Sequence, residues 1–117
     1  MSNVHGLPRV RIVRMPQGEA PEPVRAKWIG LELPCLFRED EALTAGVVTG
    51  NSMPVHSAYA IHQTTAMEAL DKVSPEAASW WRTLGYPKTP TAFWYFDAGC
   101  IQEIEKVPTF EEFTSHN

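Results

Sequence analysis

Two packed helices are predicted by residues 65–85, which read TAMEALDKVSPEAASWWRTLG. The first half carries an apolar stripe at helical spacing, made of Ala66, Leu70 and Val73. Thr65 and Glu68 have the spacing of a capping box, in which both side chains bind backbone N–H groups at the helix start. Ser74-Pro75 interrupts the stripe, because the residue before a proline is pushed out of the helical region. Ser74 is then the N-cap of a second helix, and the closing glycine ends that helix.

Strands are predicted on both sides of this hairpin, over residues 9–15, 26–33, 47–48, 55–63 and 91–96. In the first, Val10 and Ile12 alternate with arginines, so the two apolar side chains should face the core. The second should place Trp28 on one face and Ile29, Leu31 and Leu33 on the other, with a bend at its glycine.

The remaining segments are predicted to be loops or short helices. Residues 16–23 are rich in proline, and residues 37–45 are acidic, so both are expected to be solvent-exposed loops. Residues 100–107 fit a strand or a helical turn, with the apolar spacing favouring the helix. Thr109 and Glu112 repeat the capping-box spacing, which predicts a short C-terminal helix that docks Phe110 and Phe113.

These elements predict an α+β fold in a single globular domain, residues 1–117. About five strands should form a small curled antiparallel sheet or an SH3-like barrel that carries the helical hairpin. An open antiparallel sheet with the helices on one face is the alternative. The chain lacks the β–α–β alternation of a parallel sheet.

Charge and composition exclude several classes of function. The net charge of −4 argues against nucleic-acid binding, and no apolar run is long enough to span a bilayer. Residues 1–38 carry a charge of +3 and residues 39–117 carry −7, which fits either neighbouring elements of one fold or two oppositely charged faces that attract a partner. The N-terminal sequence lacks the order of a signal peptide, so we expect a cytoplasmic protein with Cys35 and Cys100 reduced and buried.

Catalytic and metal-binding motifs are weak. Ser52 lies in an incomplete nucleophile-elbow pattern that fits a turn better. His56 and His62 would be about 20 Å apart on one strand, too far to share a metal ion. The acidic run at residues 39–41 lacks the alternating oxygens and glycine of a calcium loop. We therefore expect no metal and no cofactor.

Aromatic residues are unusually dense: seven of the twelve in the chain fall between residues 80 and 96. On a strand over 91–96, Phe93 and Tyr95 point one way while Trp94 and Phe96 point the other, so both faces should be covered. The cover is either the helical hairpin, a second copy of the chain, or a ligand or partner peptide. Trp80 and Trp81 diverge by about 100° on a helix, so one of them should lie at a boundary. The candidate binding surface is formed by Trp80, Trp81, Tyr86, Trp94 and Phe96.

Two short stretches, Trp28–Pro34 (WIGLELP) and Glu76–Arg82 (EAASWWR), resemble segments of small uncharacterised bacterial proteins, some of them encoded on mobile gene cassettes. The resemblance covers about a sixth of the chain and implies a bacterial, cytoplasmic accessory protein. It brings no reaction, cofactor or site residue with it.

Two functional hypotheses follow. The leading one is a non-catalytic interaction module, homodimeric or with a protein or small-molecule partner, in which alanine at Trp81 or Trp94 weakens association without unfolding the chain. The alternative is a small enzyme whose pocket brings His56 or His62 together with a carboxylate such as Asp97 or Glu103.

Overall fold

The computed structural model describes residues 6–15, 20–40 and 57–115. Within these ranges the chain forms β1 (Arg9–Ile12), α1 (Glu22–Ala26), β2 (Glu32–Pro34), β3 (Phe37–Glu39), β4 (Ala58–His62), α2 (Gln63–Val73), α3 (Pro75–Thr83), β5 (Phe93–Asp97), the 3₁₀ turn η2 (Ala98–Cys100), β6 (Ile101–Glu103) and α4 (Phe110–Ser115). All strand ladders are antiparallel, and the predicted α+β class is confirmed.

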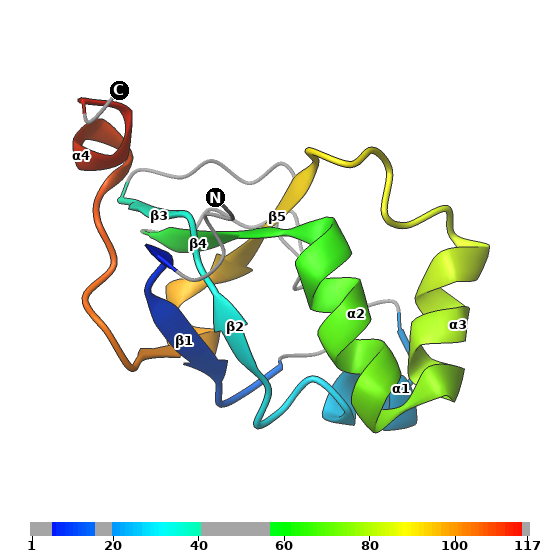
Figure 1. Ribbon diagram of the computed structural model, residues 1–117. Coiled ribbons are helices and arrows are strands. Elements are labelled where there is room, and N and C mark those ends of the chain that lie inside the picture. The colour runs from blue at the N-terminus through cyan, green and yellow to red at the C-terminus, as the bar shows by residue number, and fades with distance from the viewer. Residues whose placement is uncertain (1–5, 16–19, 41–56, 116–117) are drawn as a thin grey trace.

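The strands form two three-stranded sheets, sheet A with the order β2-β1-β6 and sheet B with the order β3-β4-β5. Chain segments pass from one sheet to the other at both edges: β2 leads into β3, and β5 leads through η2 into β6 (Figure 1). At the first bend the amide of Cys35 donates to the carbonyl of Pro8, just before β1 of sheet A, and the amide of Leu36 donates to the carbonyl of Ala60 in sheet B, each at 2.8 Å. The described ladders do not close into a barrel, so the SH3-like barrel is not confirmed.

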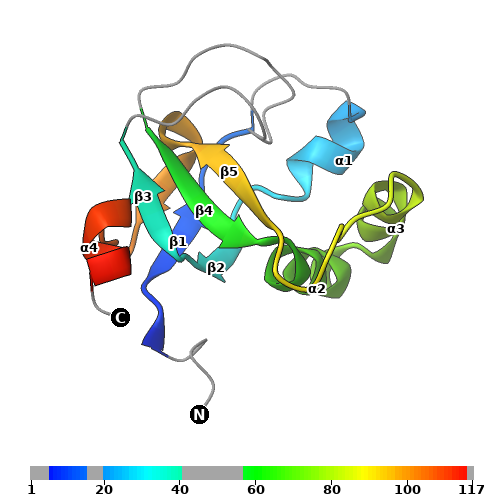
Figure 2. The same ribbon diagram turned by 90° about the horizontal axis from the view of Figure 1, so that it is seen from above.

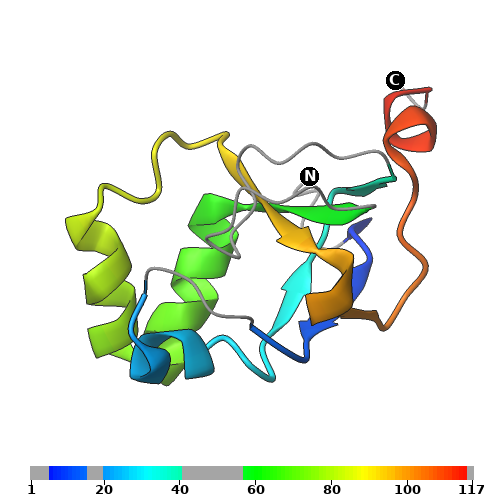
Figure 3. The same cartoon turned by 180° about the vertical axis from the view of Figure 1, so that it is seen from behind.

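The core lies between the two sheets and the helical hairpin. One buried cluster joins sheet A to sheet B and to the helices, and it includes Val10, Ile12, Trp28, Leu33, Ile61, Leu70, Trp81, Trp94 and Phe96. Helices α1, α2 and α3 lie together at one end of the sheets, and α4 lies at the opposite end (Figure 1, Figure 3). Val10 and Ile12 face the core as their alternation predicts, although β1 ends three residues before Met15.

The helical hairpin is confirmed, with one correction at its start. The Ser74 hydroxyl accepts the amide of Ala77 at 3.2 Å, and Pro75 opens α3. Gly85 follows the last turn with φ +92°, a conformation that favours glycine. The predicted Thr65 cap is wrong, because β4 runs directly into α2 and His62 occupies the N-cap position.

The predicted strand over residues 26–33 is wrong for most of its length. The chain there forms the end of α1, a turn through residues 27–30 and only then β2. Gly30 has φ +95° and ends the turn, while its amide donates to Ile12 at 2.7 Å. Trp28 and Leu33 are both buried and Ile29 is half-exposed, so the expected alternation of faces does not occur.

Four further segments differ from the prediction. The expected loop over residues 37–45 begins as β3, and the segment after η2 is strand β6 rather than a helical turn. Part of the predicted proline-rich loop, from Glu22, belongs to α1. Within the described part of the predicted strand 55–63, β4 covers Ala58–His62, and Gln63 already begins α2. The predicted strand at 47–48, together with Ser52 and His56, lies outside the described residues.

Candidate functional site

Strand β5 presents aromatic side chains on both of its faces. Its register against β4 pairs Trp94 with Ile61 and Phe96 with Tyr59, and these four side chains point into the core. The alternate residues Phe93 and Tyr95 pair with His62 and Ala60 and point to the outer face of sheet B. The strand therefore separates an inner from an outer group of rings, as the alternation predicts.

The inner aromatic cluster consists of Trp28, Trp80, Trp81, Tyr86, Trp94 and Phe96. Trp28 is fully buried at its centre, with edge-to-face contacts to the rings of Trp81 at 6.0 Å and Trp94 at 5.8 Å. Trp81, Trp94 and Phe96 are at most 9% exposed, whereas Trp80 and Tyr86 are half-buried at the rim. Three of the five predicted binding residues thus lie in the core, covered by the hairpin and the turn that carries Trp28.

Two indole N–H groups of this cluster have no acceptor among the described residues. They are Nε1 of Trp28 and Nε1 of Trp81, and both atoms are buried. The adjacent Trp80 is the boundary residue of the pair, so the predicted divergence is confirmed. An unpaired buried donor costs on the order of 1–3 kcal/mol, so the packing of the rings must outweigh that cost.

The outer aromatic cluster consists of Phe37, Phe93, Tyr95, Phe110 and Phe113. Phe37 of β3 lies at its centre, with ring centroids at 5.7 Å from Phe93, 4.9 Å from Phe110 and 5.2 Å from Phe113. Phe37 is 4% exposed, but Phe93 is 38% and Phe110 is 41% exposed. Figure 2 looks onto β3, β4 and β5, with α4 at the β3 edge of the sheet.

Helix α4 begins at its predicted capping box. The amide of Thr109 donates to a Glu112 carboxylate oxygen at 2.9 Å, and the amide of Glu112 donates to the Thr109 hydroxyl at 3.2 Å. The prediction that Phe110 and Phe113 dock is confirmed, since both rings pack on Phe37. These two rings cover Phe37, whereas Phe93 and Phe110 themselves remain partly exposed, so α4 leaves part of the outer cluster open to solvent.

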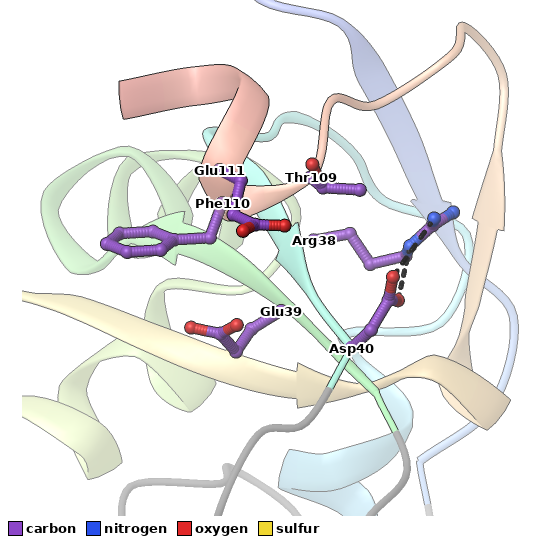
Figure 4. A pocket seen from close by; sticks show the side chains of 6 residues that line it. All are labelled: Arg38, Glu39, Asp40, Thr109, Phe110 and Glu111. Atoms are coloured by element: carbon purple, nitrogen blue, oxygen red, sulfur yellow. Dashed lines mark hydrogen bonds and ion pairs between the residues drawn. The ribbon is translucent and has the colours of Figure 1, made fainter. Parts of the chain in front are cut away.

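A hollow of about 370 Å³ lies between β3 and the start of α4, beside the outer cluster. Its lining consists of Arg38, Glu39, Asp40, Thr109, Phe110 and Glu111. Figure 4 shows Arg38 paired with Asp40 on one side, while the carboxylates of Glu39 and Glu111 and the ring of Phe110 lie on the other. The hollow therefore combines an aromatic wall with carboxylates.

A partly buried polar cluster centred on Glu103 fixes the segment that leads into α4. Glu103 accepts the Tyr59 hydroxyl at 2.7 Å and the amide of Val107 at 3.0 Å, and its carboxylate lies 3.4 Å from Arg38. Burial and the hydrogen bond to Glu103 raise the pKa of Tyr59 to about 12. The amide of Arg38 donates to Pro108 at 2.8 Å, so residues 104–109 are held against the edge of β3.

The described residues do not bring together the groups of the enzyme hypothesis. His62 and Asp97 lie at opposite ends of the β4–β5 ladder, about 13 Å apart along the strands. Glu103 is bound to Tyr59, which lies on the inner face of sheet B, whereas His62 is on the outer face. Cys35 is fully buried, and burial raises the pKa of its thiol to about 12, so it is a poor nucleophile.

Within residues 6–15, 20–40 and 57–115, no group of three or more His, Cys, Asp and Glu side chains could hold a metal ion. No helix in that part of the chain combines the length and apolar character needed to cross a membrane. Neither a protein-family model, nor a curated protein, nor a solved structure matches this chain.

Proposed function

We propose that this chain is a non-catalytic interaction module that binds a segment of another polypeptide across its outer aromatic cluster. The observation that carries the proposal is the exposure of Phe93 and Phe110, at 38% and 41%, on either side of the buried Phe37. Aromatic residues are enriched at protein interfaces and are among the residues that contribute most of the binding energy there.

The shape of the cluster favours a polypeptide over a small molecule. Its rings come from β3, β5 and α4, and those of Phe93, Phe110 and Phe113 surround Phe37 on the outer face of the sheet. Small-molecule sites usually bury most of the ligand within a concave pocket. The surface predicted from the sequence is a weaker candidate, because three of its five residues already fill the core. It consists of Trp80, Trp81, Tyr86, Trp94 and Phe96, and the buried three are Trp81, Trp94 and Phe96.

The proposal can be tested by selecting random peptides from a displayed library on immobilised protein. The test variant is Phe93→Ser with Phe110→Ser, which removes both exposed rings. The matched control is Val73→Ser with Leu84→Ser, which removes two apolar side chains that are somewhat more exposed, at 53% and 44%, from the helical hairpin. We expect selected peptides to bind the wild type and the control alike, and to lose at least tenfold in affinity for the test variant.

Two outcomes would overturn the proposal. Peptides that bind the test variant as well as the wild type would place the interaction on another surface. A dimer detected by sedimentation that dissociates only in the test variant would assign the outer cluster to a second copy of the chain. Unfolding midpoints of all three proteins must agree closely, so that a binding loss is not a loss of fold.

A further inference from the structure

The charges around the outer aromatic cluster are not balanced within the described chain. Arg38 is the cation of the hollow, and it is already paired with Asp40 at 2.7 Å and with Glu103 at 3.4 Å. Glu39 and Glu111 form no ion pair with the residues that the structure describes. Two negative charges therefore face the hollow without a positive partner from that part of the chain.

Other charged groups nearby do not remove this excess. Glu112 uses its carboxylate to cap α4 at Thr109, and the same hydrogen bonds lower its pKa, so it stays ionised. Lys106 is the other neighbouring cation and lies near Glu112 on the exposed segment before α4. Burial raises the pKa of the Tyr95 phenol, and the negative charge of Glu39 raises it further, so this carboxylate is near the rings of the outer cluster.

We propose that the bound segment is positively charged, with a Lys or Arg side chain in the hollow between Glu39 and Glu111 and its aliphatic stem along Phe110. This inference rests on the proposed function and adds the chemistry of the partner. A hollow of about 370 Å³ is roughly ten times the volume of a water molecule in the liquid, so a long side chain fits. A cation in the hollow would form ion pairs with two carboxylates and would contact the face of an aromatic ring. Apolar side chains that flank the cation in the bound segment would cover Phe93.

The electrostatics also predict which segments are excluded. An acidic or phosphorylated segment would bring like charges beside Glu39 and Glu111, and such contacts cost several kcal/mol across an interface. A basic partner should bind more weakly as salt is added, because both carboxylates remain at least partly exposed to solvent and salt screens exposed ion pairs. Residues 39–117 carry −7, which should attract a basic segment from a distance as well.

The inference is tested by NMR titration of the labelled protein with two acetylated tripeptide amides. The first is Leu-Arg-Leu, and the second replaces arginine with citrulline, a neutral side chain of the same shape. We expect saturable shifts at the amides of residues 38–40 and 109–112 with the arginine peptide. The citrulline peptide should bind the wild type about fivefold more weakly than the arginine peptide does, because two partly exposed ion pairs are lost. The arginine peptide should bind the variant that combines Glu39→Gln with Glu111→Gln about fivefold more weakly for the same reason. The matched control, Glu22→Gln with Glu76→Gln, neutralises exposed acids elsewhere and should bind as the wild type does.

Each other outcome has a definite meaning. Equal binding of the arginine and citrulline peptides, or of the wild type and the Glu39/Glu111 variant, would overturn the inference. No saturable shift with either peptide would also overturn it. If library peptides still require Phe93 and Phe110 in those cases, the proposed function stands and only the charge of the partner is wrong. If library binding fails as well, both proposals fail.

Discussion

Replacing Trp94 with alanine is expected to lower the free energy of unfolding by about 3–5 kcal/mol, the range for removing a buried aromatic ring from a core. Trp94 is 5% exposed, and its ring lies 5.8 Å from Trp28, 5.5 Å from Trp81 and 4.9 Å from Tyr86. These neighbours come from two separate parts of the chain, the turn after α1 and the end of α3, so they cannot all move into the space left by the indole. A loss of that size approaches the whole stability of a small domain.

The neighbouring Phe93 is the matched control for this substitution. It lies on the same strand but on the outer face, and it is 38% exposed. Alanine at Phe93 should therefore cost about 1 kcal/mol, the central value for point substitutions, because its ring is partly exposed but packs on Phe37. Urea unfolding followed by tryptophan fluorescence and circular dichroism measures both variants. Similar losses for the two would mean that Trp94 is not more deeply packed than Phe93.

This expectation changes what the aromatic-rich sequence predicts. From the sequence alone, alanine at Trp81 or Trp94 should weaken association and leave the fold intact. The burial of both rings instead predicts unfolding, while alanine at Phe93 or Phe110 should weaken binding with the fold retained. The density of aromatic residues indicates a binding surface only once each ring on β5 has been assigned to the buried or to the exposed face of the strand.

Two of the three helix caps predicted from local sequence signals are present, and the one at Thr65 is not. The hydroxyl of Ser74 and the capping box of Thr109 act within four residues of their own positions, and both are present. The turn at Trp28 could not be predicted in this way. Its direction follows from contacts with Trp81 and Trp94, which lie more than fifty residues away in the sequence. Propensity for a strand is readily overridden by such packing.

The outer aromatic cluster was missed for a related reason. Because Phe37 precedes an acidic run, the sequence predicts a solvated loop there, and it predicts no partner for the rings of Phe110 and Phe113. The ladder of β3 with β4 brings Phe37 opposite Ala60, whose small side chain leaves room beside Tyr95 in the same row. The alternation of β5 and the capping box of α4 were both visible in the sequence. The pairing of β3 with β4, which brings β5 and α4 together around Phe37, is a long-range contact that the sequence does not reveal.

The second large effect should appear at high pH. Burial, as the largest cause, raises the pKa of Cys35 from 9.0 to about 12, of Cys100 from 9.0 to about 11 and of Tyr59 from 10.0 to about 12. In the unfolded chain these groups lose their protons near their ordinary values, whereas in the folded protein they keep them. Between pH 9 and 12 the folded state therefore binds more protons, so its stability is complete below pH 9 and falls as the pH rises.

Cys35 should account for much of this loss, because its side chain is fully buried. A pKa difference of about three units corresponds to at most about 4 kcal/mol, approached as the pH nears 12. The test compares urea unfolding of the wild type and Cys35→Ala from pH 7 to pH 11 with a phosphine reductant, which prevents a disulfide in the unfolded chain. The variant should be less stable at pH 7, since a small cavity replaces the thiol, yet should lose less stability at high pH. Parallel curves for the two proteins would show that the thiol of Cys35 titrates at the same pH in the folded and unfolded states.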